Sequence, residues 1–367
     1  EPIGKLLAKL ALPTIAAQLI NMLYNIVDRI YIGHIPDTGA MALTGVGVCM
    51  PLIMIITAFA ALVGNGGAPT IFMGKNKKDD AEKILANCFT MQILLSVILT
   101  VVLLIWNRDF LLAFGASANT IEYAASYMNI YALGTIFVQL TLGMNAFITA
   151  QGFAKEGMLS VLIGAIANII LDPIFIFGLH MGVRGAALAT VISQCCSCIW
   201  VISFLFGKRT TLRIRGKNMG LKAAYILPCL ALGSAIFIMQ GSESIISVCF
   251  NSSLLKYGGD IAVGAMTILT SVMQFAMLPL QGLGQGAQPI MSYNYGARNA
   301  ARVKKAYFLL LKASLCYSIL LWGLVMLFPQ IFAGMFTPDA ELIAFTKTAL
   351  RIYMAVMFIF GIQISCQ

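Results

Sequence analysis

The chain has 367 residues, of which 60% are hydrophobic and 10% are charged, and its mean hydropathy is +0.89. A soluble protein carries about a quarter charged residues, so this composition excludes a soluble globular fold. The net charge of +10 does not indicate nucleic-acid binding, because the basic residues cluster in short loops between apolar segments and leave no domain to form a groove.

Ten apolar segments are long enough to cross a bilayer as helices, which predicts an all-α polytopic membrane protein. The segments cover residues 9–33, 42–73, 84–106, 122–149, 157–178, 185–206, 224–251, 260–294, 304–328 and 340–367. The second and the eighth are longer than the about 30 Å of hydrocarbon requires. We expect these two helices to tilt or to project from the membrane.

The charges of the loops predict how the chain is oriented. The N-terminal stretch and the even-numbered loops hold 17 lysines and arginines, against three in the odd-numbered loops. The positive-inside rule therefore predicts that the N-terminus lies in the cytoplasm. The membrane that we expect is the plasma (inner) membrane. The most basic stretch is 207–221, GKRTTLRIRGKNMGL. We expect it to be a cytoplasmic linker that lies on the anionic leaflet.

The two sides of this linker are related by an internal repeat. Leu10-Ala11-Leu12 returns 220 residues later, and Gly64, Gly66 and Pro69 return at 284, 286 and 289. Six spans precede the linker, an even number, so the two halves have parallel topology. A pseudo-two-fold axis along the membrane normal should relate them.

The repeat divides the chain into three parts. An N-lobe with six transmembrane helices covers 1–206, the basic cytoplasmic linker covers 207–221, and a partial C-lobe with four helices covers 222–367. A complete fold would have two six-helix lobes. The repeat therefore predicts that the second lobe is incomplete here and lacks the end of span ten and spans eleven and twelve.

Several polar residues lie inside the fifth and sixth spans. Asn168 and Asp172 are four residues apart and share one helix face, and Pro173 cannot donate a hydrogen bond to the carbonyl of Ile169. Thr190 of the next span lies at a similar depth. These groups form a small site for a hard cation such as Na⁺, or for a proton. A kinked helix with a capped polar residue is the alternative, but ionisable residues inside membranes are rare, which favours function.

Asp28, near the end of the first span, lies at the same predicted depth as Asp172. A buried carboxylate can carry a proton, or can bind Na⁺ when it is ionised, and the sequence leaves both open. A simple ion pair between Asp28 and Arg29 is the structural alternative.

The seventh span carries Glu243, with Gln240 one turn before it. If the lobes face each other across a cavity, these two residues supply polar groups on the second wall. A cavity with carboxylates, methionines and aromatic walls fits an organic cation. The alternative is that Glu243 is a polar residue that packs helices against each other.

In the first span, Pro13 predicts a kink, which is either an ordinary kink or a bend coupled to protonation.

Other chemistry finds little support in the sequence. Cys195 and Cys198 have a C-x-x-C spacing, but no second pair or histidine accompanies them, since His34 and His180 lie in loops. We find no phosphate-binding loop and no catalytic triad. We therefore expect no cofactor, no resident metal and no enzymatic activity.

Six short motifs occur in a fixed order between residues 10 and 190. They are L-x-x-P at 10–13, V-D-x-x-x-x-G at 27–33, G-x-G-x-x-P at 64–69, A-Q-G at 150–152, N-x-x-x-D-P at 168–173 and G-A-A-L-A-T at 185–190. In this combination the chain resembles the multidrug and toxic compound extrusion (MATE) transporters. It is most similar to the prokaryotic branch with an Asp in the first span.

The resemblance implies a secondary active transporter that exports small lipophilic organic cations in exchange for Na⁺ or H⁺ by alternating access, as a monomer surrounded by membrane lipids. It implies that Pro13 is the bending proline of the first span and that Glu243 lies near a substrate-cavity carboxylate. An acidic residue that other members carry in the tenth span has no counterpart here. The resemblance implies a cation site made of Asp28, Asn168, Asp172, Thr190 and Tyr127.

A flippase for lipid-linked oligosaccharides, from the same superfamily, is the main alternative. It predicts a cavity with more arginines, whereas almost all basic residues here lie in loops. A membrane enzyme would need clustered His, Cys or Ser–Lys pairs at one depth, which the sequence lacks.

Overall fold

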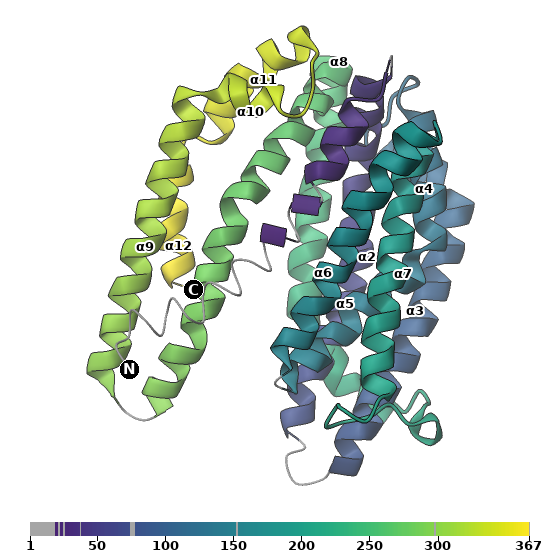
Figure 1. Ribbon diagram of the computed structural model, residues 1–367, viewed down its shortest axis with the longest axis vertical. Helices are drawn as coiled ribbons and strands as arrows, with labels where there is room; N and C mark the ends of the chain where they lie inside the picture. The colour runs from purple at the N-terminus through teal and green to yellow at the C-terminus, as the bar shows by residue number, and fades with distance from the viewer. Residues whose placement is uncertain are drawn as a thin grey trace. The chain divides into compact units, whose positions relative to one another are not determined.

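The computed structural model describes residues 19–20, 23–24, 26–36, 38–73, 78–151, 153–296 and 299–366, and these residues form helices and turns without a strand (Figure 1). This confirms the predicted all-α fold class. The elements are α2 (Gly39–Met73), α3 (Lys78–Ala113), α4 (Ile121–Leu133), α5 (Thr135–Ala150), α6 (Ala154–Pro173), the π-helical turn η1 (Ile174–Gly178), α7 (Val183–Phe206), the 3-10 turn η2 (Gly216–Asn218), α8 (Ala223–Gly296), α9 (Ala300–Leu327), α10 (Pro329–Gly334), α11 (Ala340–Tyr353), the 3-10 turn η3 (Met357–Ile359) and α12 (Phe360–Cys366).

Within the described residues, six helices are long and apolar enough to cross a membrane, and two bent helix pairs raise the number to eight. The multi-pass character is therefore confirmed. Most of the first predicted span lies outside the described residues, but residues 26–33 are helical.

The 74-residue element α8 contains both the seventh and the eighth predicted span. A straight helix of that length would measure about 110 Å, far more than a bilayer. Gly259 interrupts it with φ 66° and ψ −166°, a backbone conformation that favours glycine. The predicted loop at 252–259 is helical up to this break, because the ends of long spans can continue beyond the hydrocarbon.

The span predicted at 122–149 is a broken helix rather than a straight one. Its two parts, α4 and α5, meet at Gly134 and are bent by 59°. A Cβ atom at Gly134 would lie 2.5 Å from Cγ2 of Val191, so only glycine allows α7 to approach this closely. The tenth predicted span is likewise bent, by 46° between α11 and the segment 357–366.

The residues group into two compact units. One contains residues up to His34 and from Gly264 onward, and the other contains 35–263. In the second unit α2 to α7 pack side by side as one bundle, and in the first α9 packs against α12 (Figure 1). The predicted lobes, their boundaries and their pseudo-two-fold axis stay predictions.

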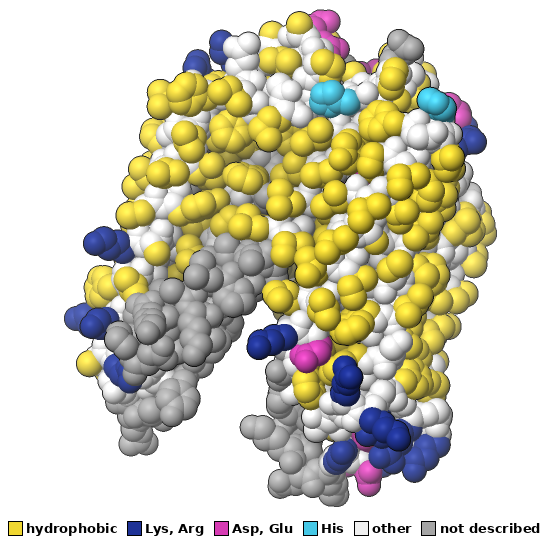
Figure 2. All heavy atoms as spheres, in the orientation of Figure 1, with side chains coloured by type: hydrophobic (Ala, Val, Ile, Leu, Met, Phe, Trp, Pro, Cys, Tyr) yellow, Lys and Arg dark blue, Asp and Glu magenta, His cyan; other side chains and the backbone are white. Residues whose placement is uncertain are grey.

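The surface of the 35–263 bundle matches a membrane environment. Figure 2 shows hydrophobic side chains over α6 and α7, with basic side chains gathered near the end where the linker lies. Ile170 and Ile199 are 55% and 61% exposed, which suits contact with lipid.

The basic linker 207–221 is docked on this bundle rather than lying only along the leaflet. Leu212 and Ile214 are buried in the same hydrophobic cluster as Phe147 and Leu85. The linker's basic side chains Lys208, Arg209, Arg215 and Lys217 remain exposed. The stretch therefore combines an anchored backbone with a basic outer surface.

Candidate functional site

The centre of the predicted cation site lies on α6. Asn168 and Asp172 are both fully buried, and Nδ2 of Asn168 donates a hydrogen bond of 3.1 Å to Oδ1 of Asp172. The spacing of four residues places both side chains on one face, as the sequence indicates. Asp172 is thus held by a neutral donor one turn earlier in the same helix.

The helix changes geometry directly after Asp172. Pro173 is the last residue of α6, and the π-helical turn η1 follows from Ile174 to Gly178. Proline has no N–H to donate to the carbonyl of Ile169, and π-turns inside helices occur frequently at functional sites. The carboxylate therefore lies directly before an irregular turn and within one helical turn of the Ile169 carbonyl, which receives no hydrogen bond from Pro173.

Thr190 lies on the return helix α7, which packs closely on α6. A Cβ at Gly185 would lie 2.7 Å from the backbone of Phe175, and Ser197 donates a 2.8 Å hydrogen bond to the carbonyl of Ser160. This antiparallel register places Thr190 level with Asn168, one turn from Asp172. Thr190 is 8% exposed and donates to the carbonyl of Ala186 at 3.0 Å, so its oxygen keeps acceptor capacity.

Tyr127 occupies α4, which also packs against α7. Its side chain is 3% exposed, and its ring stacks on that of Tyr131 with a centroid distance of 6.1 Å. The structure thus buries Tyr127 in the same bundle as the α6 pair. Its participation in the site stays a prediction.

The α6 pair offers oxygen to a cation. Oδ1 of Asn168 is buried and has no hydrogen-bond partner among the described residues. No three His, Cys, Asp or Glu side chains come together in the described part of the chain. The available donors are a carboxylate, an amide oxygen, a hydroxyl and backbone carbonyls, which suit a hard monovalent cation or a proton.

Asp28 belongs to the other compact unit, so its sharing of a site with Asp172 stays a prediction. Asp28 is 8% exposed and its Oδ1 atom has no hydrogen-bond partner among the described residues. Arg29 is 4% exposed and donates from Nη1 to the hydroxyl of Ser271 in α8. Sequence reasoning considered only Asp28 as a partner for Arg29, because a contact across 242 positions leaves no local signal.

The predicted residues of the seventh span lie in the first part of α8. Glu243 is exposed, and Gln240 is half-buried with an Oε1 atom that has no hydrogen-bond partner among the described residues. Their place in a substrate cavity stays a prediction. Pro13 lies outside the described residues.

Sequence reasoning missed the groups that hold the linker. Buried Glu82 forms an ion pair with Nε of Arg215 at 2.8 Å. Asn87 donates from Nδ2 to the carbonyl of Asn218 at 3.3 Å and accepts at Oδ1 from the backbone N–H of Lys222, directly after the linker, at 2.8 Å. Gln151 accepts from the backbone N–H of Leu212 at 2.7 Å. The only signal for them in the sequence is their position at span ends beside a basic loop.

Known proteins similar to this chain include membrane transporters. The MatE family model matches residues 13–174 and 235–367. The multidrug export protein MepA of Staphylococcus haemolyticus (strain JCSC1435) is 26% identical over 362 residues, which cover 98% of this chain and 79% of that protein. MepA of Staphylococcus aureus (strain NCTC 8325 / PS 47) is 24% identical and covers 99% and 80%.

Solved structures give the same result. The MATE multidrug transporter DinF-BH is 33% identical, with a TM-score of 0.82, and the match covers 98% of this chain and 81% of that one. An inward-facing multidrug resistance MATE family transporter of the MOP superfamily has a TM-score of 0.81 at 24% identity over 97% and 85%. Because the family model covers most of the chain and the fold agrees, the chain belongs to the MATE family of membrane transporters.

Proposed function

We propose that this protein is a secondary active multidrug exporter that moves small lipophilic organic cations out of the cell in exchange for Na⁺ or H⁺. The observation that carries the proposal is the fully buried Asn168–Asp172 pair at an irregular helix end inside a membrane bundle. The names of the relatives, which are multidrug export proteins, support export as the direction and drugs as the substrates.

The α6 pair supplies the coupling step. An ionised carboxylate inside a membrane is costly, so Asp172 gains from binding a proton or a Na⁺ ion that removes its net charge. The amide oxygen of Asn168 and the hydroxyl of Thr190 complete the shell around Na⁺, with Asp28 and Tyr127 as further members. When the cation is present, Asp172 is neutralised, and when it leaves, the site must rearrange.

Coupling follows from differential affinity. A cation shifts an equilibrium between inward-open and outward-open states only if it binds one of them more tightly. Each charge that crosses the membrane field contributes about 2.3 kcal/mol per 100 mV. We propose that cation binding favours the state that releases the drug outward, and that Glu243 and Gln240 contact the cationic substrate.

The test uses the full chain in proteoliposomes loaded with a cationic dye such as ethidium. A Na⁺ gradient and a pH gradient are imposed in turn on wild type, Asp172→Asn, Asp28→Asn and the control Asp109→Asn, whose carboxylate is exposed at the end of α3. One gradient should drive dye movement in wild type and in the control. Asp172→Asn should lower it at least tenfold, because it replaces the titratable carboxylate with a neutral amide that has only one oxygen.

Two results would contradict the proposal. Equal dye movement in wild type and Asp172→Asn would make the buried pair structural. If neither gradient moves a cationic dye but the protein moves a lipid-linked oligosaccharide, the flippase alternative replaces drug export.

A further inference from the structure

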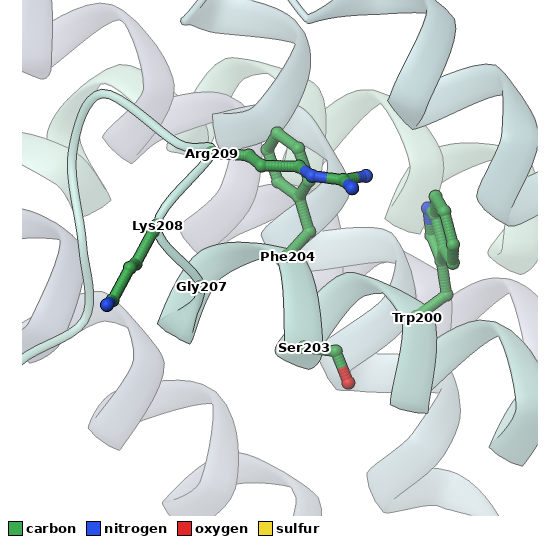
Figure 3. Close-up of a pocket in the computed structure, with 6 residues that line it drawn as sticks. All are labelled: Trp200, Ser203, Phe204, Gly207, Lys208 and Arg209. Carbon is green, nitrogen blue, oxygen red and sulfur yellow. The ribbon is translucent and has the colours of Figure 1, made fainter.

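A pocket of about 320 Å³ lies where α7 ends and the linker begins. Its lining residues, shown in Figure 3, are Trp200, Ser203, Phe204, Gly207, Lys208 and Arg209. None of them belongs to the predicted cation site. The pocket has two chemically different sides, an apolar wall on the helix and a basic edge on the linker.

The apolar wall is preformed. Trp200, Phe204 and Gly207 are spaced by four and three residues, so they follow one face of α7. The indole N–H of Trp200 donates to the carbonyl of Glu156 at 3.2 Å, which fixes the ring. Phe204 packs edge-on against Phe153 with a centroid distance of 5.2 Å. An acyl chain that lies on this wall would therefore meet rings that are already held in place.

The basic edge is available to an anion. Lys208 and Arg209 are exposed, and neither forms an ion pair within the described residues. In Figure 3 the Arg209 side chain extends toward Trp200, whereas Lys208 points to the other side of the linker. Arg213 donates from Nη2 to the carbonyl of Lys208 at 3.2 Å and brings a third cation close by.

The helix itself does not attract an anion here. The pocket lies at the C-terminal end of α7, where the helix dipole is negative. An anion must therefore be held by the side chains, and Arg209 is the one that reaches over the apolar wall. Binding should therefore depend more on Arg209 than on Lys208.

The position of the pocket selects the ligand. Val183–Phe206 is apolar enough to cross the membrane, and the basic linker begins at Gly207. The pocket thus spans the boundary between hydrocarbon and headgroups. A ligand that matches both sides has an apolar chain and an anionic head at this depth, whereas a soluble anion would use the basic edge alone.

We propose that this pocket is a binding site for one acidic phospholipid of the cytoplasmic leaflet, with its phosphodiester at Arg209, its chain on Trp200 and Phe204, and Lys208 as a flanking cation. The site is independent of the transport proposal, because none of its residues takes part in cation coupling. It would tie the docked linker to the membrane surface.

The experiment uses Trp200 as the reporter. The chain has three tryptophans, so Trp106→Phe and Trp322→Phe leave Trp200 as the only one in the full-length protein. The purified protein in detergent micelles is titrated with phosphatidylglycerol that carries brominated chains, which quench nearby indoles, and separately with brominated phosphatidylcholine. Quenching by the acidic lipid should saturate and occur at several-fold lower concentration than quenching by the neutral lipid.

Variants on this background test the basic edge. Each basic residue near a membrane surface contributes about 1 kcal/mol, so Arg209→Gln should weaken binding about fivefold, and Arg209→Lys should retain most of it. Lys208→Gln should have a smaller effect, because its side chain points away. Lys304→Gln/Lys305→Gln, a matched basic pair on α9, should leave quenching unchanged.

Three outcomes would overturn the proposal. Equal quenching by the two lipids would show an unselective annular contact. Unchanged affinity in Arg209→Gln would remove the headgroup contact. Full competition by inorganic phosphate or glycerol phosphate would show that the pocket binds a soluble anion instead of a lipid.

Discussion

Three polar residues of the bundle hold the linker in place. The carboxylate of Glu82 is 1% exposed and pairs with Arg215 at 2.8 Å, while Gln151 and Asn87 satisfy backbone groups of the linker. A buried acceptor that loses its donor, or the reverse, costs about 1–3 kcal/mol. The linker is therefore kept in position by specific bonds and not only by its charge.

The substitution Glu82→Gln tests this anchor. It keeps the size of the side chain but removes the charge that pairs with Arg215 and that accepts a hydrogen bond from the backbone N–H of Arg213. A hydrogen bond to a charged group contributes about 1.5 kcal/mol or more. We expect trypsin to cleave the linker after Arg213, Arg215 or Lys217 roughly tenfold faster than in wild type.

Asp80→Asn is the matched control, since Asp80 pairs with Lys83 at 3.1 Å on the same helix but both side chains are more than a third exposed. Surface ion pairs contribute little, so its cleavage rate should stay at the wild-type value. Equal rates in all three proteins would show that the Glu82–Arg215 pair does not restrain the linker.

At the scale of the elements, α2 and the first part of α8 cross at two glycines. A Cβ atom at Gly66 would collide with the carbonyl of Cys229, and a Cβ at Gly233 would collide with the carbonyl of Leu62. Helices in a membrane gain no hydrophobic driving force from each other, so close backbone approach at small residues is what joins them. The seventh span is thereby packed into the bundle of α2 to α7.

Gly66→Ala should destabilise the protein by about 2 kcal/mol, because the methyl group forces the two helices apart. Thermal unfolding in detergent would show this as a lower Tm. Gly241→Ala in α8 is the control, since nothing lies within 4 Å of its Cβ position. It should be neutral, or stabilising by up to about 1 kcal/mol through helix propensity. A similar Tm for both variants would contradict the close contact between α2 and the first part of α8 at Gly66.

A second test of the same packing uses two native cysteines. The Sγ atoms of Cys88 in α3 and Cys229 in α8 are 3.7 Å apart and both side chains are buried. Mild oxidation with copper phenanthroline should join them through one disulfide, which mass spectrometry of the digested protein would identify as a peptide linking residues 88 and 229. Cys88→Ser should abolish that peptide, and its absence in wild type would place α3 and α8 further apart.

At the scale of the whole molecule, the placement of basic residues predicts the orientation in the membrane. The N-terminal stretch and the even-numbered predicted loops hold seventeen lysines and arginines, against three in the odd-numbered predicted loops. The linker with Lys217 should face the cytoplasm, and the end of the first part of α8, with Lys256, should face outward. Both side chains are exposed.

Labelling from each side measures this orientation. In a background without native cysteines, Lys217→Cys should react with a membrane-impermeant maleimide in inverted vesicles only. Lys256→Cys should react on intact cells only. The opposite pattern would reverse the predicted topology.

The sequence by itself determined the helical multi-pass fold and the α6 pair. Ten apolar segments and the spacing of Asn168 and Asp172 are local features, and local periodicity is what a sequence records directly. Pro173 likewise indicated the irregular helix end that the structure shows as η1. Family motifs then gave the residues of the cation site as expectations.

Tertiary structure alone decided which distant residues meet. Nothing near Arg29 in the sequence indicates its contact with Ser271. The repeat marks Gly64 and Gly66, but it does not show that Gly64 packs against Gly143 of α5 or that Gly66 packs against the first part of α8. The composition of the linker predicts a basic surface segment, yet Leu212 and Ile214 are buried in the hydrophobic core of the bundle. These contacts depend on packing between elements far apart in the chain, and the periodicity of each element fixes its buried face but not its partner.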